Sequence, residues 1–397
     1  AASDVYKRQA SNGASSFVRT EAIDTVTNIS VTTVANASGG AEGESSSSIK
    51  LNAPLDYASQ GRAVTAEDYK VYVRKLFPNT QAVSVWGGED GSFDTSTGVS
   101  STPEYGKVFI SVKSTTSLNL TTSQKENLVK DLNPYKVASI TPVIVDPETT
   151  FIILGITFNY NSSATTQSKT DLETSVSNTI ASFTDNNLED FNLPFRHSLV
   201  TGLIDDVDSA ITNNTTTVTM AKFFTPSLTT STNYTVSFNN AFYNPHSGHN
   251  SSGGGVIAST GFQIDGDTST EYFFDEDGSG NLRTYSVVSG TRTYLNSTAG
   301  SVDYANGIVT INALKITAVS NIDGETSTTI RVTAIPSSND IVPVRNQLLE
   351  LDLVNTTITG QVDNTTTTGV GYTTTTSGTA STTSVNTTTS YPTSSSY

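Results

Sequence analysis

The sequence predicts a multidomain α+β protein, and three observations support this prediction. Amphipathic helical segments alternate with short apolar strands between residues 49 and 222. Between residues 223 and 362 the helical period disappears, and short strands separated by Asp-Gly and Asn-Gly turns indicate a β-sandwich or meander. Residues 363–397 are almost pure Thr, Ser and Gly. They bury too little apolar area to offset about 1–2 kcal/mol of backbone entropy per residue, so we expect a disordered tail.

The first 48 residues are interpreted in two parts. Residues 1–9, AASDVYKRQ, match the translation of a sequencing-library adapter, and we interpret them as a scar that is not part of the natural protein. On this interpretation Ala10 is an internal residue of a longer protein whose N-terminal part is missing. Residues 10–48 are predicted to be a β-rich entry with a Gly/Ser-rich linker. The linker carries Glu42 and Glu44, which we interpret as part of a solvated loop rather than as a catalytic pair.

Residues 49–149 are predicted to form a small α/β domain of the ferredoxin-like, split βαβ type. Its first strand is an extended arm over Ile49–Tyr57, stopped at Pro54. A helix capped by Thr65 and Asp68 follows. Its apolar face consists of Tyr69, Tyr72, Val73 and Leu76. The later elements are strands over 81–86 and 105–113, a helix capped by Thr122 or Ser123 with Leu128, Val129 and Leu132 on one face, and a strand over 137–145.

Residues 150–222 are predicted to form a second α/β layer. A turn at 146–148 returns the chain into an apolar strand over 151–160. A helix over 170–183 places Leu172, Val176, Ile180 and Phe183 on one face. A second helix runs over 199–211, and a strand over 215–224 closes the layer. Asp205, Asp206 and Asp208 lie opposite the apolar face of the second helix, and we interpret them as a solvated face rather than a metal site.

The β-rich domain is predicted over residues 223–362. Its strands are expected at 234–238, 261–264, 272–274, 282–288, 308–311, 314–319 and 329–334, and 341–354 adds an edge strand. The turns between them are Asp265-Gly266, Asp277-Gly278, Asn306-Gly307 and Asp323-Gly324.

Composition excludes several classes of protein. The 397 residues carry a formal charge of −16, which argues against nucleic acid or an anionic membrane as the main partner. There is no cysteine, so disulfide frameworks and cysteine nucleophiles are excluded. The longest apolar run, residues 151–158, is too short to span a bilayer, and we find no signal peptide.

The short motifs do not predict a catalytic, cofactor or metal site. Residues 275–281, DEDGSGN, place oxygen ligands at alternate positions, but the bidentate Glu of a calcium loop is missing, so we expect a hairpin turn. His246 and His249 are spaced as a metal pair, but zinc needs more ligands and His197 is the only other histidine. The S-x-x-K match at 47–50 has no companion motif and is attributed to chance.

One stretch resembles a known family. The order "APLDYASQGRAVTAEDYK … VSVWGGED … YGKVFISVK" within residues 53–113 resembles the baseplate J-like family, to which the baseplate wedge proteins of T-even-like contractile-tailed phages belong. Similar segments are GGAEGES at 39–45, TPVIVDP at 141–147 and VRNQL at 344–348. The resemblance extends patchily from about residue 18 to about residue 362 and is weakest from 223 to 340.

The resemblance implies a structural subunit of a phage tail baseplate with no active site. Such a subunit self-associates, binds other wedge proteins and forms a sixfold ring that rearranges on sheath contraction; no small-molecule substrate is implied. We expect Tyr57, Arg62, Trp86 and Arg345 at contacts, because large aromatics and arginines contribute most to interfaces. The alternative is a secreted or surface β-rich adhesin with a Thr/Ser-rich stalk.

Overall fold

The computed structural model describes residues 46–94, 98–100, 102–117, 119–188, 190–249, 255–363, 366–367 and 372–373. The predicted scar, nearly all of the β-rich entry and nearly all of the tail lie outside these residues. The chain forms two compact units. Unit 1 comprises residues 1–151, 187–195 and 220–350, and unit 2 comprises residues 152–186, 196–219 and 351–397. Helices and many strands are both present, which agrees with the predicted α+β class.

The extended arm predicted over Ile49–Tyr57 is wrong, because these residues lie in helix α2 (Ser46–Ser59). Pro54 does not stop a strand but lies inside the helix, where a proline costs a hydrogen bond without excluding the helix. α2 contacts helix α3 (Ala66–Leu76) through a 2.7 Å hydrogen bond between the hydroxyls of Ser59 and Tyr72. The predicted split βαβ order therefore lacks its first strand.

The start of α3 agrees with the prediction in detail. The Thr65 hydroxyl accepts from the Asp68 amide at 3.3 Å, and the Asp68 carboxylate accepts from the Thr65 amide at 2.8 Å, which completes a capping box. The predicted apolar face is also confirmed. Tyr69, Tyr72 and Val73 are buried, and Leu76 packs against the same core.

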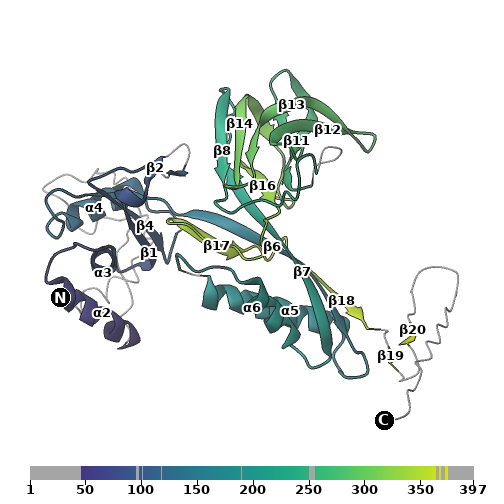
Figure 1. Cartoon of the computed structure of the whole chain (residues 1–397), viewed down its shortest axis with the longest axis horizontal. Coiled ribbons are helices and arrows are strands. Elements are labelled where there is room, and N and C mark those ends of the chain that lie inside the picture. The colour runs from purple at the N-terminus through teal and green to yellow at the C-terminus, as the bar shows by residue number, and fades with distance from the viewer. Residues whose placement is uncertain are drawn as a thin grey trace, which may run out of the picture. The chain divides into compact units, whose positions relative to one another are not determined.

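This core lies on a three-stranded sheet of order β1-β4-β5 in unit 1 (Figure 1). β1 and β4 are antiparallel, as predicted, and β4 and β5 are parallel. Leu128 and Leu132 of helix α4 join the core. The N-cap of α4 is Thr121, one residue before the predicted Thr122, and Gln124 completes its capping box. The bounds are β1 Thr80–Gly87, β4 Lys107–Ser114, α4 Thr122–Leu132 and β5 Thr141–Val145; a short 3-10 turn, Gly88–Asp90, and the hairpin β2 (Ser92–Asp94) and β3 (Gly98–Ser100) lie between β1 and β4.

A second sheet has the order β17-β6-β7-β16-β9, and β18 also pairs with β6, in parallel. The hairpin predicted between the strands over 137–145 and 151–160 is wrong, because β5 pairs with β4 and β6 belongs to this second sheet. The chain is redirected at Asp146–Glu148, where the Asn346 side chain donates to the Asp146 carbonyl and the Glu148 amide donates to the Asn346 carbonyl. The bounds are β6 Glu148–Tyr160, β7 Ile211–Phe224, β9 Ile257–Ser259, β16 Ile330–Ala334, β17 Gln347–Leu351 and β18 Thr357–Val362.

Unit 2 contains two helices that lie beside its strands (Figure 1). Helix α5 (Lys169–Asn187) buries the four predicted residues Leu172, Val176, Ile180 and Phe183. The second predicted helix is too long, because α6 (His197–Asp205) ends six residues before Ile211, the first residue of β7. Between α6 and β7 the Asp208 carboxylate accepts from the Ala210 amide at 2.8 Å, which forms a turn where the prediction had continued the helix.

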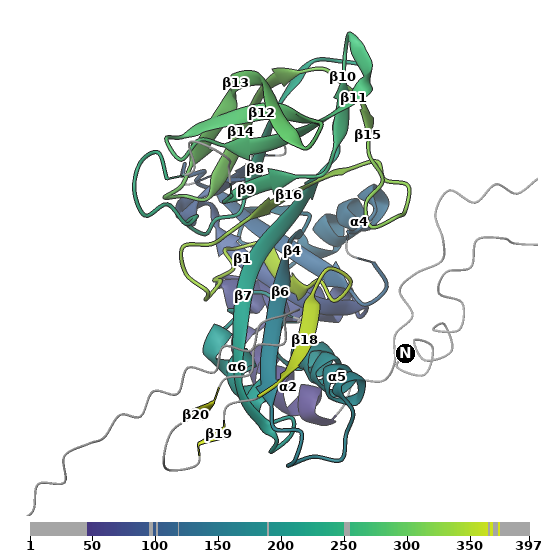
Figure 2. The same cartoon turned by 90° about the vertical axis from the view of Figure 1, so that its right-hand side faces the viewer.

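A seven-stranded sheet of order β15-β10-β11-β12-β13-β14-β8 lies in unit 1 and is drawn in green in Figures 1 and 2. The Asn306-Gly307 turn joins β13 to β14 as predicted, and Gly307 has φ +67°. Strand β13 itself was not predicted, because its sequence TRTYLNSTAGSVD has few apolar residues. The bounds are β8 Thr232–Ser237, β10 Phe262–Ile264, β11 Asp267–Glu276, β12 Asn281–Val288, β13 Thr291–Asp303, β14 Ile308–Leu314 and β15 Ile316–Val319. Across the described residues no helix is long and apolar enough to cross a membrane.

Replacement of Thr65 by Ala should destabilise the chain by about 1 kcal/mol, because it removes the hydroxyl that satisfies a helix N-terminal amide. Thr65→Ser keeps this acceptor and is the matched control. Urea denaturation followed by circular dichroism measures both. Equal stability of the Ala and Ser variants would contradict the cap.

Asp267, at the start of β11, should make stability depend on pH. Hydrogen bonds from Thr270 and Ser269 hold the pKa of its carboxyl well below the ordinary value of 3.8. A depressed native pKa contributes stability that is present above the unfolded pKa and lost as the pH falls through the native value. Asp267→Asn should therefore destabilise the chain at neutral pH and less in acid. NMR titration of the Asp267 carboxyl checks the shift, and an ordinary pKa would refute it.

Candidate interaction surfaces

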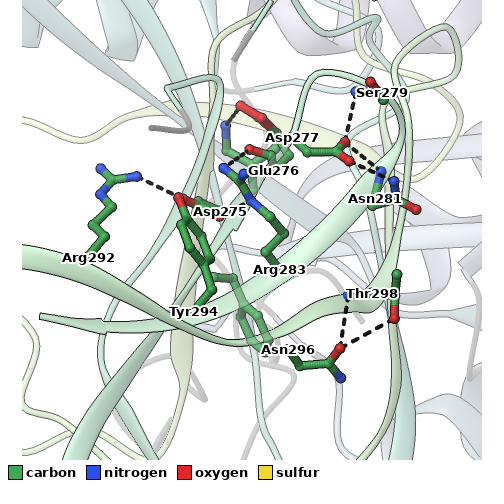
Figure 3. Close-up of polar contacts among 12 residues, drawn as sticks. Asp275, Glu276, Asp277, Ser279, Asn281, Arg283, Arg292, Tyr294, Asn296 and Thr298 are labelled. Atoms are coloured by element: carbon green, nitrogen blue, oxygen red, sulfur yellow. Dashed lines mark hydrogen bonds and ion pairs between the residues drawn. The ribbon is translucent and has the colours of Figure 1, made fainter. Parts of the chain in front are cut away.

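A buried polar cluster connects β11, β12 and β13 in unit 1 (Figure 3). Its centre is Asp275, which is 1 % exposed. The Asp275 carboxylate accepts from Arg283 Nε at 2.9 Å, from Arg292 Nη1 at 2.8 Å and from the Tyr294 hydroxyl at 3.0 Å. Arg283 also donates to the Glu276 carbonyl at 2.6 Å. One carboxylate thus receives two guanidinium groups and a phenol.

Strand register places these groups on one face of the sheet. Asp275 lies opposite Arg283, and Tyr285 lies opposite Tyr294. The Arg283 guanidinium lies 4.3 Å from the centroid of the Tyr294 ring, and that of Arg292 lies 4.6 Å from the centroid of the Tyr285 ring. Each arginine therefore combines an ion pair with a cation–π contact across neighbouring strands.

The cluster is suited to stability rather than to acid–base chemistry. The Asp275 carboxylate already accepts three hydrogen bonds, two of them from guanidinium groups, so its acceptor positions are occupied within the protein. Burial raises the pKa of the Tyr285 and Tyr294 hydroxyls, and for Tyr294 the hydrogen bond to Asp275 adds to the rise. Burial also raises the pKa of nearby Tyr304 to about 12. All three phenols are therefore protonated at neutral pH.

Past the end of β11, β12 and β13 continue as an exposed two-stranded ribbon, residues 287–298, which includes Arg292 and Tyr294 of the cluster. The register of β11 with β12 ends at Ser286, and that of β13 with β14 begins at Gly300, so over this stretch β12 and β13 form ladder pairs only with each other. All are exposed, including Val287 (53 %), Val288 (55 %) and Leu295 (55 %). An exposed apolar ribbon of this kind is typical of a protein contact surface.

Sequence reasoning missed this cluster and the ribbon. A usable signal was present, because Asp275 and Arg283 are equidistant from the Gly278–Gly280 turn and a hairpin there places them opposite each other. The predicted turn is confirmed: Asp277 accepts from the amides of Ser279 at 2.8 Å and of Asn281 at 3.0 Å. Its carboxylate also accepts from the Asn281 side chain at 2.6 Å, so both of its oxygens take part in the turn.

The four predicted contact residues lie in unit 1 in two kinds of environment. Tyr57, on α2, is 85 % exposed, and Arg62 is also exposed. Trp86 is 6 % exposed and stacks on Phe109 at a centroid distance of 5.6 Å. Arg345 is half-buried and donates to the carbonyl of Asp90. The structure therefore presents Tyr57 and Arg62 on the surface and uses Trp86 and Arg345 within the unit.

No group of three or more His, Asp or Glu side chains is arranged to hold a metal ion among the described residues. Asp205, Asp206 and Asp208 lie at and after the end of α6, and Asp205 accepts from the Asn214 side chain at 2.7 Å. His246 and His249 lie next to each other in an exposed turn of unit 1.

Two family descriptions match consecutive segments of the chain. Residues 65–145 match "Baseplate structural protein gp6, C-terminal domain I", and residues 148–223 match "Baseplate structural protein gp6, C-terminal domain III". These limits coincide with structural elements, because the first segment runs from the α3 cap to the end of β5 and the second from β6 to β7. Over these two segments the chain is therefore similar to C-terminal domains of a phage baseplate structural protein.

A curated relative agrees with this assignment. The chain is 29 % identical over 210 residues to the baseplate wedge protein gp6 of Enterobacteria phage T4, an alignment that covers 50 % of this chain and 30 % of the relative. The chain therefore spans less than a third of that protein's length. The seven-stranded sheet lies outside both family-matched segments of this chain.

Replacement of Asp275 by Asn should destabilise the chain by about 3–5 kcal/mol, because Arg283, whose side chain is 8 % exposed, loses its buried counter-charge. The control is Asp265→Asn in the same sheet, which breaks a pair with Lys315 between two half-exposed side chains and should cost less than about 1 kcal/mol. Urea denaturation measures both. Similar costs for the two variants would show that the Asp275 cluster does not stabilise the sheet.

Proposed function

We propose that this chain is a structural subunit of a contractile-tail baseplate wedge, located in the tail of the virion. The observation that carries the proposal is the pair of adjacent family matches, whose limits follow the elements of the structure. The side-chain chemistry supports it as well, because the best-formed polar cluster is saturated by its own hydrogen bonds and ion pairs. Such a protein acts through the surfaces it presents.

Two exposed surfaces of unit 1 suit subunit contacts. One is the α2 surface, defined by Ile49 (48 % exposed), Tyr57 (85 %) and Arg62. The other is the ribbon, residues 287–298. A tyrosine and an arginine on the first surface are residue types enriched at interface hot spots. We propose that the α2 surface mediates self-association and that the ribbon contacts other wedge proteins.

Immunogold labelling of the phage that encodes this chain tests its location. Antibodies raised against the purified chain should label the end of the tail distal to the head. Label on the capsid, or on the host cell surface in the absence of particles, would overturn the baseplate proposal; the latter result would favour an adhesin.

The α2 surface can be tested by light scattering of the full chain over a concentration series. The wild type should form a dimer or larger closed oligomer, and Arg62→Glu combined with Tyr57→Ser should shift association to at least about tenfold higher concentration, the effect of about 1.4 kcal/mol. The matched control is Tyr105→Ser, because Tyr105 is 78 % exposed and lies off this surface in sequence and fold.

A strictly monomeric wild type, or an equal effect of the Tyr105→Ser control, would contradict self-association through the α2 surface. Neither result would bear on the immunogold experiment, so the location and the contact are tested separately.

A further inference from the structure

The turn at residues 246–249 brings two imidazole rings together. His249 Nδ1 lies 3.3 Å from His246 Nε2, the ring centroids are 4.9 Å apart, and the ring planes are inclined at 82°. Both side chains are exposed. The sequence contains too few histidines to predict a complete zinc site, and it does not contain the distance between these two nitrogens.

The separation of these nitrogens is within hydrogen-bond distance, and it also fits two ligands of one metal ion. Two nitrogens that each lie about 2.0–2.1 Å from one Zn²⁺ in tetrahedral geometry are about 3.3–3.4 Å apart. Adjacent nitrogens of a square-planar ion at a similar bond length are only about 2.9 Å apart. The observed distance therefore matches the tetrahedral case.

The turn is held in place by contacts that do not involve His246 Nε2 or His249 Nδ1. The His249 amide donates to the His246 carbonyl at 3.2 Å, and the Gly248 amide donates to the Gly278 carbonyl at 3.0 Å. Gly248 has φ +75°, a conformation that glycine adopts without strain. The Tyr243 ring contacts the His249 ring edge-on at a centroid distance of 5.6 Å. These contacts fix the spacing of the two rings before any metal binds.

We propose that His246 and His249 form a two-histidine site for a divalent transition metal, with Zn²⁺ as the geometrically favoured ion. Imidazole is a common ligand for zinc, copper and nickel. The pair supplies two of the four tetrahedral positions, and the exposed setting leaves the other two to water or to ligands from a neighbouring chain. A second copy of this turn would complete a four-histidine site, so one ion per two chains is an allowed stoichiometry. This site does not depend on the proposed baseplate function.

Isothermal titration of ZnCl₂ into the untagged full chain, in metal-free and non-coordinating buffer, tests the site. Zinc should bind saturably, with one ion per chain or per two chains. His246→Gln and His249→Gln should each weaken binding at least about tenfold, because even groups outside the first coordination shell are commonly worth about 10- to 100-fold in metal affinity. The matched control is His197→Gln, which removes the third histidine from unit 2, where its ring contacts the Thr216 carbonyl at 2.9 Å.

A second readout identifies the ligands directly. In histidine-selective NMR spectra, zinc should shift the ring signals of His246 and His249 and leave those of His197 unchanged. The proposal is overturned if zinc does not bind saturably at millimolar concentration, if both single variants bind zinc as tightly as the wild type, or if zinc shifts His197 instead. Any of these results would mean that the two rings form a metal-free hydrogen-bonded pair.

Discussion

Unit 1 depends on two buried side-chain amides that follow one another in the chain. Asn346 and Gln347 are both 0 % exposed. Asn346 donates to the Asp146 carbonyl at 2.9 Å, between β5 and β6, and Gln347 donates to the Phe238 carbonyl at 3.0 Å, just after β8. Residues next to the ends of β5, β6, β8 and β17 therefore meet at one polar junction. A buried carbonyl that loses its donor costs about 1–3 kcal/mol, so no apolar substitute can perform this role.

The junction also explains how a large β-sheet can be inserted without disturbing the family-matched segments. The chain leaves the second matched segment at the end of β7, builds the seven-stranded sheet and returns at residues 344–347. β16 pairs with β7 shortly before this return, so the insertion is fixed at both of its ends. The seven-stranded sheet and the ribbon on it are therefore held by the rest of unit 1 and not by a flexible linker. Binding elements are usually positioned by a rigid scaffold in this way.

The sequence predicts those elements that depend on residues close together in the chain, and it fails for those that depend on residues far apart in the chain. The Thr65 cap and the buried faces of α3 and α5 follow from neighbours within a few residues and were predicted well. The helix around Pro54 and the separation of β5 and β6 into different sheets were missed, because tertiary contacts decided both. The buried amides, the Asp275 cluster and the spacing of His246 and His249 require strand register or turn geometry, which composition and periodicity do not contain.

The ribbon illustrates how such long-range chemistry prepares a surface for contact. A two-stranded ribbon is marginally stable in water, and this one has exposed apolar residues on an otherwise acidic chain. Its base is secured by Asp275, which holds Arg283 from β12 and Arg292 from β13, so both strands are tied to β11. Arg292 is the charged side chain of the ribbon, and it is already paired with Asp275. A partner would therefore meet a preorganised ribbon that offers mainly apolar and hydroxyl groups, and preorganisation reduces the entropy lost on binding.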